Sequence, residues 1–344
     1  MTANPPLRVC IVGAGSLGCL FATRLSYAGA LVTLVQRGPQ SGEGVVRDKV
    51  TIRLDHPAKQ EKKEAVVTLA EGLDSLNRGG LEDNDPFDLV MVNVKHHDTK
   101  GVANGLFRAL ERNVLQPKSA IVSMQNGIGN TDILKSVLGG KVSPGSILPG
   151  LTYTGASLTE PLVSRCNGNG ATIIQAPRSD ISVSFESQHV SDILHRFQIC
   201  YNAGTQDEAG FASVVDDIMP LMWTKLLVNA VLNPIVALAN QTNSYILDPW
   251  VLPMVQASCD EFNQLAVKED VELQLNGHSP VDFVLSVGKA SNTNVCSTVA
   301  DLRQGRQTEL EAINGFVSRR AAAHGLKVPV LDSLYRLVST LDHN

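Results

Sequence analysis

The chain has 344 residues, of which 43% are hydrophobic, 18% charged and only 5% aromatic. This length is typical of about two domains, and the high hydrophobic fraction excludes a disordered chain. The formal net charge is −5, and a mildly acidic chain without a basic patch is not a general nucleic-acid-binding protein. The scarcity of aromatic residues predicts a core of aliphatic side chains.

Several other classes are disfavoured by motifs that the sequence lacks. The six cysteines are scattered without a C-x-x-C, which predicts free thiols in a reducing compartment and a cytoplasmic protein. The eight histidines form no H-E-x-x-H and no Cys/His cluster, so no metal site is expected. The most apolar stretch, 218–239, contains Lys225 and two asparagines, and we expect no membrane span.

The N-terminus carries the strongest local pattern. An apolar strand over 8–12 leads into Gly13-Ala14-Gly15-Ser16-Leu17-Gly18, followed by an apolar helix over 17–28 and a β-branched strand over 31–35. This is the strand–turn–helix–strand context that a G-x-G-x-x-G dinucleotide-binding motif requires. Its first glycine permits the tight turn, its second lets a pyrophosphate approach, and its third lets helix pack on strand. The helix start would then hold the phosphates.

The residues after the second strand indicate which dinucleotide binds. NAD-binding sites usually have an acidic residue there for the ribose hydroxyl, whereas this chain has Gln36-Arg37. A guanidinium suits a 2′-phosphate, so the cofactor predicted is NADP(H). The alternative is that Arg37 is an ordinary solvated surface residue.

Two later strands place polar residues at their carboxyl ends. The strand over 88–94 ends at Lys95, and the strand over 119–124 ends at Gln125-Asn126-Gly127. Ligands of doubly wound sheets bind outside these ends, so Lys95 and Asn126 are candidate ligand-binding residues. The alternatives are a solvated lysine and a simple Asn-Gly turn.

The remaining N-terminal half gives weaker signals. The segment 38–86 is polar and charged, with weak edge strands expected at 51–54 and 65–69. Further strands are expected at 146–154 and 171–175 and a helix at 190–203, which would close an α/β domain over residues 1–210. Residues 211–344 show long helical patterns and hardly any strand signal, which predicts an all-helical second domain.

The apolar helix expected over 218–239 carries an aligned polar row. Lys225, Asn229 and Asn233 are spaced four apart and therefore lie on one stripe. Pro234 should kink this helix. These polar side chains either form hydrogen bonds to another helix or bind a ligand. We favour the ligand, because polar groups buried on an apolar helix without partners cost free energy. Because burial lowers the pKa of a lysine, Lys225 is a candidate general acid, with the asparagines positioning substrate hydroxyl or carboxylate groups.

A last long helix is expected from Ser297 to about Ala323, stopped by Gly325. Glu309 would lie on its apolar side, where a carboxylate needs a partner such as a lysine. The alternative is an i,i+3 pair between Arg306 and Glu309.

These segments together resemble the ketopantoate reductase (2-dehydropantoate 2-reductase) family along nearly the full chain. The resemblance rests on five segments of this sequence: Val12–Gly18, Val94-Lys95, Gln125-Asn126-Gly127, Trp223 through Lys225, Asn229 and Asn233 to Pro234, and Ser297 through Thr308-Glu309 to Ile313-Asn314-Gly315.

The resemblance implies a Rossmann domain joined to a helical domain, with the active site in the cleft and NADPH as donor for the reduction of ketopantoate to pantoate in the pantothenate pathway. It implies Lys225 as proton donor, with Glu309 holding the lysine. It also implies substrate binding by Asn126, Asn229, Asn233, Asn243 and Ser297. Cofactor contacts are implied for residues 13–18, Arg37, Lys95, Asn126, Ala156 and Glu309.

Two other functions stay open at this point. The same scaffold serves NADP-dependent reductases or dehydrogenases of other branched 2-keto or 2-hydroxy acids. A non-catalytic NADP-binding sensor would need the glycine turn but not Lys225 and the asparagine row. We expect a small 2-keto acid as the partner, with no nucleic acid and no membrane, and either a monomer or a homodimer.

Overall fold

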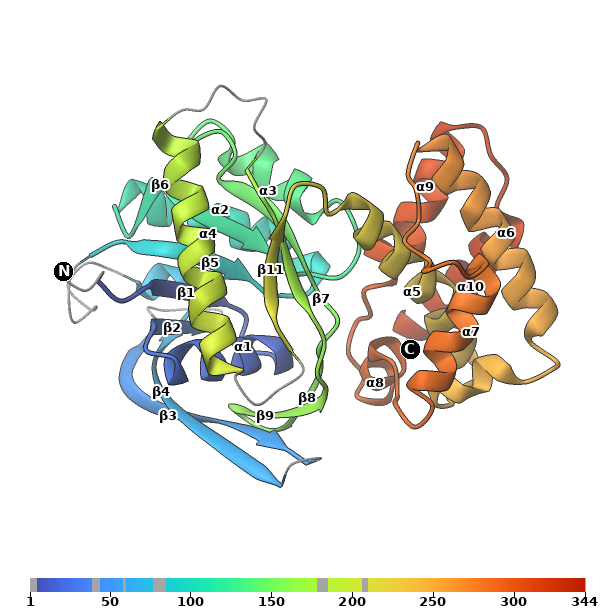
Figure 1. Ribbon diagram of the computed structural model, residues 1–344, viewed down its shortest axis with the longest axis horizontal. Coiled ribbons are helices and arrows are strands. Elements are labelled where there is room, and N and C mark those ends of the chain that lie inside the picture. Colours follow the sequence, from blue (N-terminus) through green and yellow to red (C-terminus); the bar gives the residue numbers. More distant parts are fainter. Residues whose placement is uncertain are drawn as a thin grey trace. The chain divides into compact units, whose positions relative to one another are not determined.

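The computed structural model describes residues 5–38, 44–57, 60–76, 85–177, 185–205 and 210–343. The chain divides into two compact units (Figure 1). Unit 1 comprises Met1–Gln125 and Asn130–Ile218, and unit 2 comprises Asn126–Gly129 and Met219–Asn344. The observed division after Ile218 lies beyond the predicted boundary at 210/211, because strand β11 (Ala212–Val215) pairs with β10 and so belongs to unit 1.

Unit 1 is built on one sheet whose described strands run in the order β11-β10-β7-β6-β5-β1-β2-β4-β3-β9-β8. The other strands are β1 (Arg8–Val12), β2 (Leu31–Gln36), β3 (Val46–His56), β4 (Glu61–Glu71), β5 (Phe87–Val92), β6 (Leu115–Ser123), β7 (Ile147–Thr152), β8 (Gly155–Glu160), β9 (Val163–Gly168) and β10 (Thr172–Gln175). Short 3₁₀ turns cover Leu73–Ser75 (η1) and His96–Asp98 (η2).

The central part of this sheet, from β7 through β6, β5, β1 and β2 to β4, is parallel. Antiparallel pairs flank it: β10 with β7 on one side and β3 with β4 on the other. The prediction of edge strands at 51–54 and 65–69 is wrong. Strand β4 lies between β2 and β3, and β3 lies between β4 and β9. Hydrogen bonding on both sides explains how a polar sequence becomes an interior strand.

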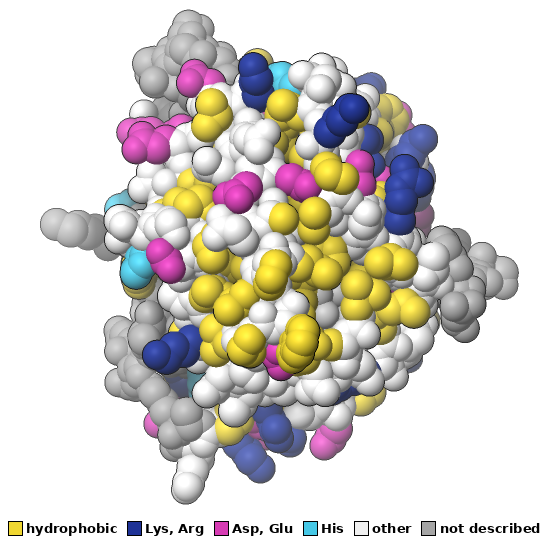
Figure 2. Space-filling view, turned by 90° about the vertical axis from the view of Figure 1, so that its right-hand side faces the viewer, with side chains coloured by type: hydrophobic (Ala, Val, Ile, Leu, Met, Phe, Trp, Pro, Cys, Tyr) yellow, Lys and Arg dark blue, Asp and Glu magenta, His cyan; other side chains and the backbone are white. Residues whose placement is uncertain are grey.

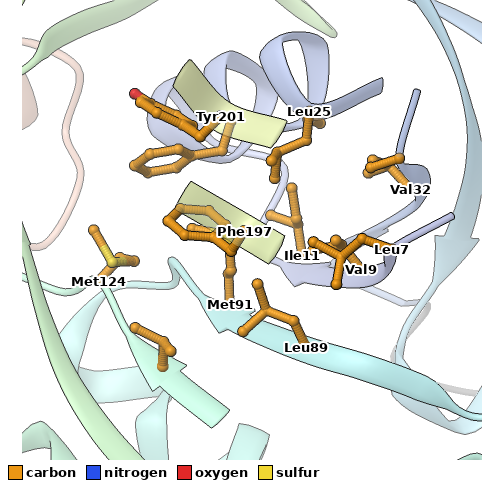
Figure 3. Close-up of a cluster of buried hydrophobic side chains, with 14 of the residues drawn as sticks. Leu7, Val9, Ile11, Leu25, Val32, Leu89, Met91, Met124, Phe197 and Tyr201 are labelled. Carbon is orange, nitrogen blue, oxygen red and sulfur yellow. The ribbon is translucent and has the colours of Figure 1, made fainter. Parts of the chain in front are cut away.

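Helices cover both faces of the sheet, and alternation along β1 directs side chains to each. Val9 and Ile11 pack in the cluster that includes α1 (Ser16–Tyr27) and α4 (Phe185–Gly204), part of which Figure 3 shows. Cys10 and Val12 pack in the opposite cluster, which includes α2 (Thr99–Glu111) and α3 (Asn130–Leu138). Successive side chains of any strand point to opposite faces. The parallel central strands with helices on both faces confirm the predicted Rossmann-type α/β fold.

The described part of unit 2 contains helices and no strand, as predicted. Its elements are α5 (Met219–Ala239), η3 (Asn243–Leu247), α6 (Leu252–Lys268), α7 (Pro280–Ala290), α8 (Ser297–Arg303), the π-helical η4 (Glu311–Gly315), α9 (Phe316–Ala323), α10 (Pro329–Ser339) and η5 (Leu341–His343). The core surrounds α5, where the Trp223 ring meets Phe262 and Phe316 edge-on, with centroids 5.8 and 5.9 Å away.

The prediction of one helix over 297–323 is wrong. Helix α8 ends at Arg303, Gly305 takes a left-handed φ of 61°, and helical structure resumes only before Glu311. The Arg306 guanidinium binds Asp301 at 2.8 Å, which replaces the alternative pair with Glu309. Glu309 therefore lies at the start of a separate helical segment and shares no helix with Ser297.

Helix α5 is long and apolar enough to span a membrane by length and composition, but 67% of its most apolar window is buried inside the protein. The burial is that of a domain's central helix. The helix passes through Pro234 without ending.

The face drawn in Figure 2 gathers hydrophobic side chains, with charged side chains around its rim. In unit 2, the large hydrophobic residue most exposed is Trp250, at 88%. Apolar surface of this kind is typical of faces that other molecules cover, so the homodimer alternative stays open.

Candidate active site

The glycine turn between β1 and α1 has the geometry that the motif predicts. Gly13 takes a φ of 112°, which only glycine adopts readily, and its N–H donates to the Val35 carbonyl at 2.8 Å. A Cβ on Gly18 would run into the Gly13 carbonyl oxygen, so this glycine sets the close approach of helix to strand. A Cβ on Gly15 would meet nothing within 4 Å.

The open space at Gly15 fits a bound dinucleotide. No neighbouring protein atom requires a glycine there, whereas a pyrophosphate lying against the backbone does. Gly15 also caps α1, whose first turn contains no acidic residue. The positive end of the helix is therefore available for an anion.

Alanine substitutions should separate the roles of these two glycines. Gly18→Ala forces its methyl group onto the Gly13 carbonyl and should lower the stability of unit 1 by roughly 1–3 kcal/mol. Gly15→Ala has free space and an ordinary φ of −77°, so we expect little change in stability but weaker dinucleotide binding. Thermal unfolding and cofactor titration of both variants make the comparison, and equal stability losses would contradict it.

The other predicted cofactor residues lie on unit 1. Arg37 follows β2 with its side chain 83% exposed, and its guanidinium binds Asp98 at 3.2 Å. Lys95 is half-buried where β5 leads into η2. Ala156 is half-buried on β8 and packs against the core on the α1 side of the sheet.

Three predicted residues come together in unit 2. The Lys225 ammonium donates to Asn126 Oδ1 at 3.0 Å, and Asn126 Nδ2 donates to Glu309 Oε2 at 3.2 Å. Asn126 thus bridges the lysine and the glutamate. The amide is oriented by both neighbours, since its oxygen must face the cation and its nitrogen the carboxylate.

The loop carrying Asn126 is held tightly against the π-helical segment. Gly127 has a φ of 80°, and a Cβ on it would collide with the Ala312 backbone. Ile128 packs against the core of unit 2. These contacts explain why residues 126–129 group with the helices although they follow a strand of unit 1.

The surroundings of Lys225 change its acidity. Burial lowers the pKa of the ammonium from 10.5 to about 8, and the negative charge of Glu309 offsets part of that shift. A lysine with this pKa gives up a proton much more readily than an exposed one. Glu309 is itself buried, with only 8% of its surface exposed.

The predicted substrate residues lie on elements that pack around α5. Asn229 is half-buried and Asn233 buried on α5 itself. Asn243 lies on η3 and donates to the Ser291 hydroxyl at 3.0 Å, and Ser297 is exposed at the start of α8. Both η3 and α8 contact α5.

Two supporting contacts were not predicted. Buried Gln125 donates to Thr99 Oγ1 at 2.7 Å and accepts from Ser123 at 3.0 Å, which fixes the end of β6. In unit 2, Thr308 Oγ1 donates to Asp342 at 2.6 Å, which anchors the residue before Glu309. The polar residues after β6 were a sequence signal for the contacts of Gln125. No local pattern indicates the bond between Thr308 and Asp342. Among the described residues, no group of His, Cys, Asp and Glu could hold a metal ion.

A phosphate-binding glycine turn on a doubly wound sheet, together with a lysine of lowered pKa in a helical unit, defines a dinucleotide-binding oxidoreductase. Two family models match the chain: "Ketopantoate reductase PanE/ApbA" over residues 9–179 and its C-terminal counterpart over 217–342. The chain belongs to this ketopantoate reductase family.

Individual relatives agree with this assignment. A 2-dehydropantoate 2-reductase of Archaeoglobus fulgidus is 28% identical over 332 residues, covering 96% of each chain. A PanE/ApbA family ketopantoate reductase from Ralstonia eutropha has the same fold, with a TM-score of 0.77, 22% identity and coverage of 98% of this chain and 99% of the other. D-mandelate dehydrogenase in complex with NADH and anilino(oxo)acetate gives a TM-score of 0.74 at 20% identity, with 98% and 99% coverage.

Proposed function

We propose that this protein reduces the 2-keto group of ketopantoate to the hydroxyl of pantoate, using NADPH. The observation that carries the proposal is the half-buried Lys225, whose pKa is lowered to about 8 and which Asn126 links to Glu309. The family and its named relatives supply the substrate, and the glycine turn supplies the dinucleotide site.

In the proposed mechanism, the dinucleotide supplies the hydride when it is bound. Lys225 donates its ammonium proton to the keto oxygen as that oxygen becomes an alkoxide. Asn126 orients the lysine, and Glu309 keeps enough of it protonated near neutral pH. Asn229 and Asn233 would hold polar groups of the substrate, with Asn243 and the Ser297 hydroxyl completing the set and Ser297 on the carboxylate.

For the choice of dinucleotide we propose NADPH over NADH. The Arg37 guanidinium follows β2, where NAD-binding sites usually have an acidic residue, and its pairing with Asp98 is exposed and therefore weak. A 2′-phosphate offers a more highly charged and bidentate partner. We propose that Arg37 exchanges Asp98 for that phosphate, with Lys95 near the same end.

A second candidate substrate class is another branched 2-keto or 2-hydroxy acid. It is favoured by the similarity of the fold to D-mandelate dehydrogenase, whose structure contains NADH and anilino(oxo)acetate. Steady-state assays of ketopantoate and a panel of branched and aromatic 2-keto acids, each with NADPH and NADH, test both proposals. Preference for another acid would replace ketopantoate, and dinucleotide binding without any turnover would leave the sensor alternative.

The rate should depend on pH through Lys225. Reduction needs the protonated form of Lys225. We therefore expect kcat/KM to be constant below about pH 8 and to fall at higher pH, as the lysine loses its proton. Glu309→Gln keeps an oxygen for Asn126 but removes the charge that raises this pKa. The alkaline limb should therefore move down by roughly one pH unit.

A matched control for this profile is Glu272→Gln, which removes an exposed carboxylate elsewhere in unit 2. That variant should keep the alkaline limb where it is. If Glu309→Gln left the limb unmoved, Glu309 would have no electrostatic role at Lys225.

We also propose a cytoplasmic location. All six cysteines are free, and burial raises the pKa of Cys10, Cys19 and Cys259 to about 12. Such thiols are unreactive and suit a reducing compartment.

A further inference from the structure

Pro234 removes one backbone hydrogen bond from the interior of α5. Proline has no N–H, so the carbonyl one turn earlier loses its helical donor. That carbonyl belongs to Ala230, which is fully buried. Helix α5 continues through both Ala230 and Pro234. A buried carbonyl without a partner costs free energy, and the helix therefore needs a donor from outside.

Asn314 is that donor. Its Nδ2 lies 2.9 Å from the Ala230 oxygen, and the side chain is 1% exposed. Its Oδ1 is buried without a hydrogen-bond partner in the part of the chain that the structure describes. A half-satisfied amide is a poor choice for a core position unless its donor is required, which indicates that the bond to Ala230 is the reason for an asparagine here.

The bond joins the two elements that carry the proposed proton donor and its countercharge. Ala230 lies between Lys225 and Asn233 on α5. Asn314 belongs to η4, the π-helical segment that follows Glu309. Single turns of π-helix are frequent at functional sites, and here the wide turn holds an amide against α5.

Apolar packing holds α5 and η4 together, and the directional hydrogen bond adds a contact that ties one carbonyl of α5 to one side chain of η4. We propose that Asn314 is a positioning residue, which binds the carbonyl freed by Pro234 and thereby sets the placement of Lys225 relative to Glu309. The inference rests on the proposed function of Lys225. Displacements of about 1 Å can lower turnover by roughly 10²-fold, so a register bond of this kind matters for catalysis.

A double-mutant cycle tests the pairing. Asn314→Leu removes the donor at similar volume, and Pro234→Ala restores the N–H that lets α5 bind the Ala230 carbonyl itself. Asn314→Leu alone should lower kcat by roughly 10–10²-fold while KM for NADPH changes little. In the Pro234→Ala background, the same substitution should cost far less, because the carbonyl no longer needs the asparagine.

The alkaline limb of kcat/KM gives a second readout. If Asn314→Leu moves Glu309 away from Lys225, the limb should shift to lower pH, and Pro234→Ala should restore it. Val317→Ala is the control, because it creates a cavity in the same core. This variant should be less stable but should keep the alkaline limb of kcat/KM at the same pH. Equal losses from Asn314→Leu in both backgrounds, or an unmoved limb, would overturn the proposal.

Two further measurements keep the test decisive. If Asn314→Leu does not fold, the double variant should still fold and resemble Pro234→Ala, and its failure to do so would count against the inference. An NMR titration of Lys225, identified by its loss in Lys225→Ala, reads the same shift without substrate. A wild-type protein that reduces no keto acid would refute the proposed function, whereas the titration would still decide the role of Asn314.

Discussion

Replacing Lys225 by alanine should lower the turnover of the keto acid by roughly 10²–10⁴-fold, the usual loss when a general acid is removed. The ammonium is the group that Asn126 holds at 3.0 Å and whose pKa is lowered to about 8. Without it, the forming alkoxide must take its proton from water. Steady-state kinetics at saturating NADPH, near pH 7, measure the effect.

The controls distinguish lost chemistry from lost structure. Lys225→Ala should bind NADPH as the wild type does, because the glycine turn lies on unit 1. Lys289→Ala removes an exposed lysine of α7 in the same unit and should keep full activity. Full activity in Lys225→Ala would refute its assignment as the acid.

Arg37→Asp should reverse the preference for dinucleotides. The substitution removes the guanidinium proposed for the 2′-phosphate and adds a negative charge beside Asp98. NADPH binding should weaken by roughly 10²-fold, as expected for losing a charge-assisted hydrogen bond worth about 1.5–3 kcal/mol. NADH, which has no such phosphate, should be affected far less.

Dissociation constants for both dinucleotides, measured by fluorescence titration, make this test independent of turnover. Arg336→Asp, which reverses an exposed charge on α10 of unit 2, controls for the change in net charge. Equal weakening of NADPH and NADH by Arg37→Asp would remove Arg37 from the 2′-phosphate site.

Local patterns predicted the first elements almost to the residue. The strand expected over 8–12 is β1. The ends of the expected helix and of the second strand lie within one residue of the ends of α1 and β2. Their glycine signals and apolar runs are complete within a short stretch of chain, so no distant contact is needed to interpret them.

Elsewhere distant contacts decided the structure. Strands β8 and β9 have mostly exposed or half-buried residues, and β11 spans only Ala212–Val215. Such strands form because a neighbour offers hydrogen bonds, and their own sequences carry little signal. The break after Arg303 escaped prediction for a different reason. Gly305 and the Arg306–Asp301 pair lie close together in the sequence, and they end the helix although the helical periodicity continues past them.

For the site, the sequence by itself determined the glycine turn and the polar row of Lys225, Asn229 and Asn233, because each depends on the fixed periodicity of one element. It also placed Pro234 in the interior of the predicted helix. Only the tertiary structure decided that Asn126, 99 positions from Lys225, lies between it and Glu309. The tertiary structure alone also decided that Asn314 binds the Ala230 carbonyl. A hydrogen bond depends on proximity in space, and the periodicity of one helix does not indicate which distant side chain will lie next to it.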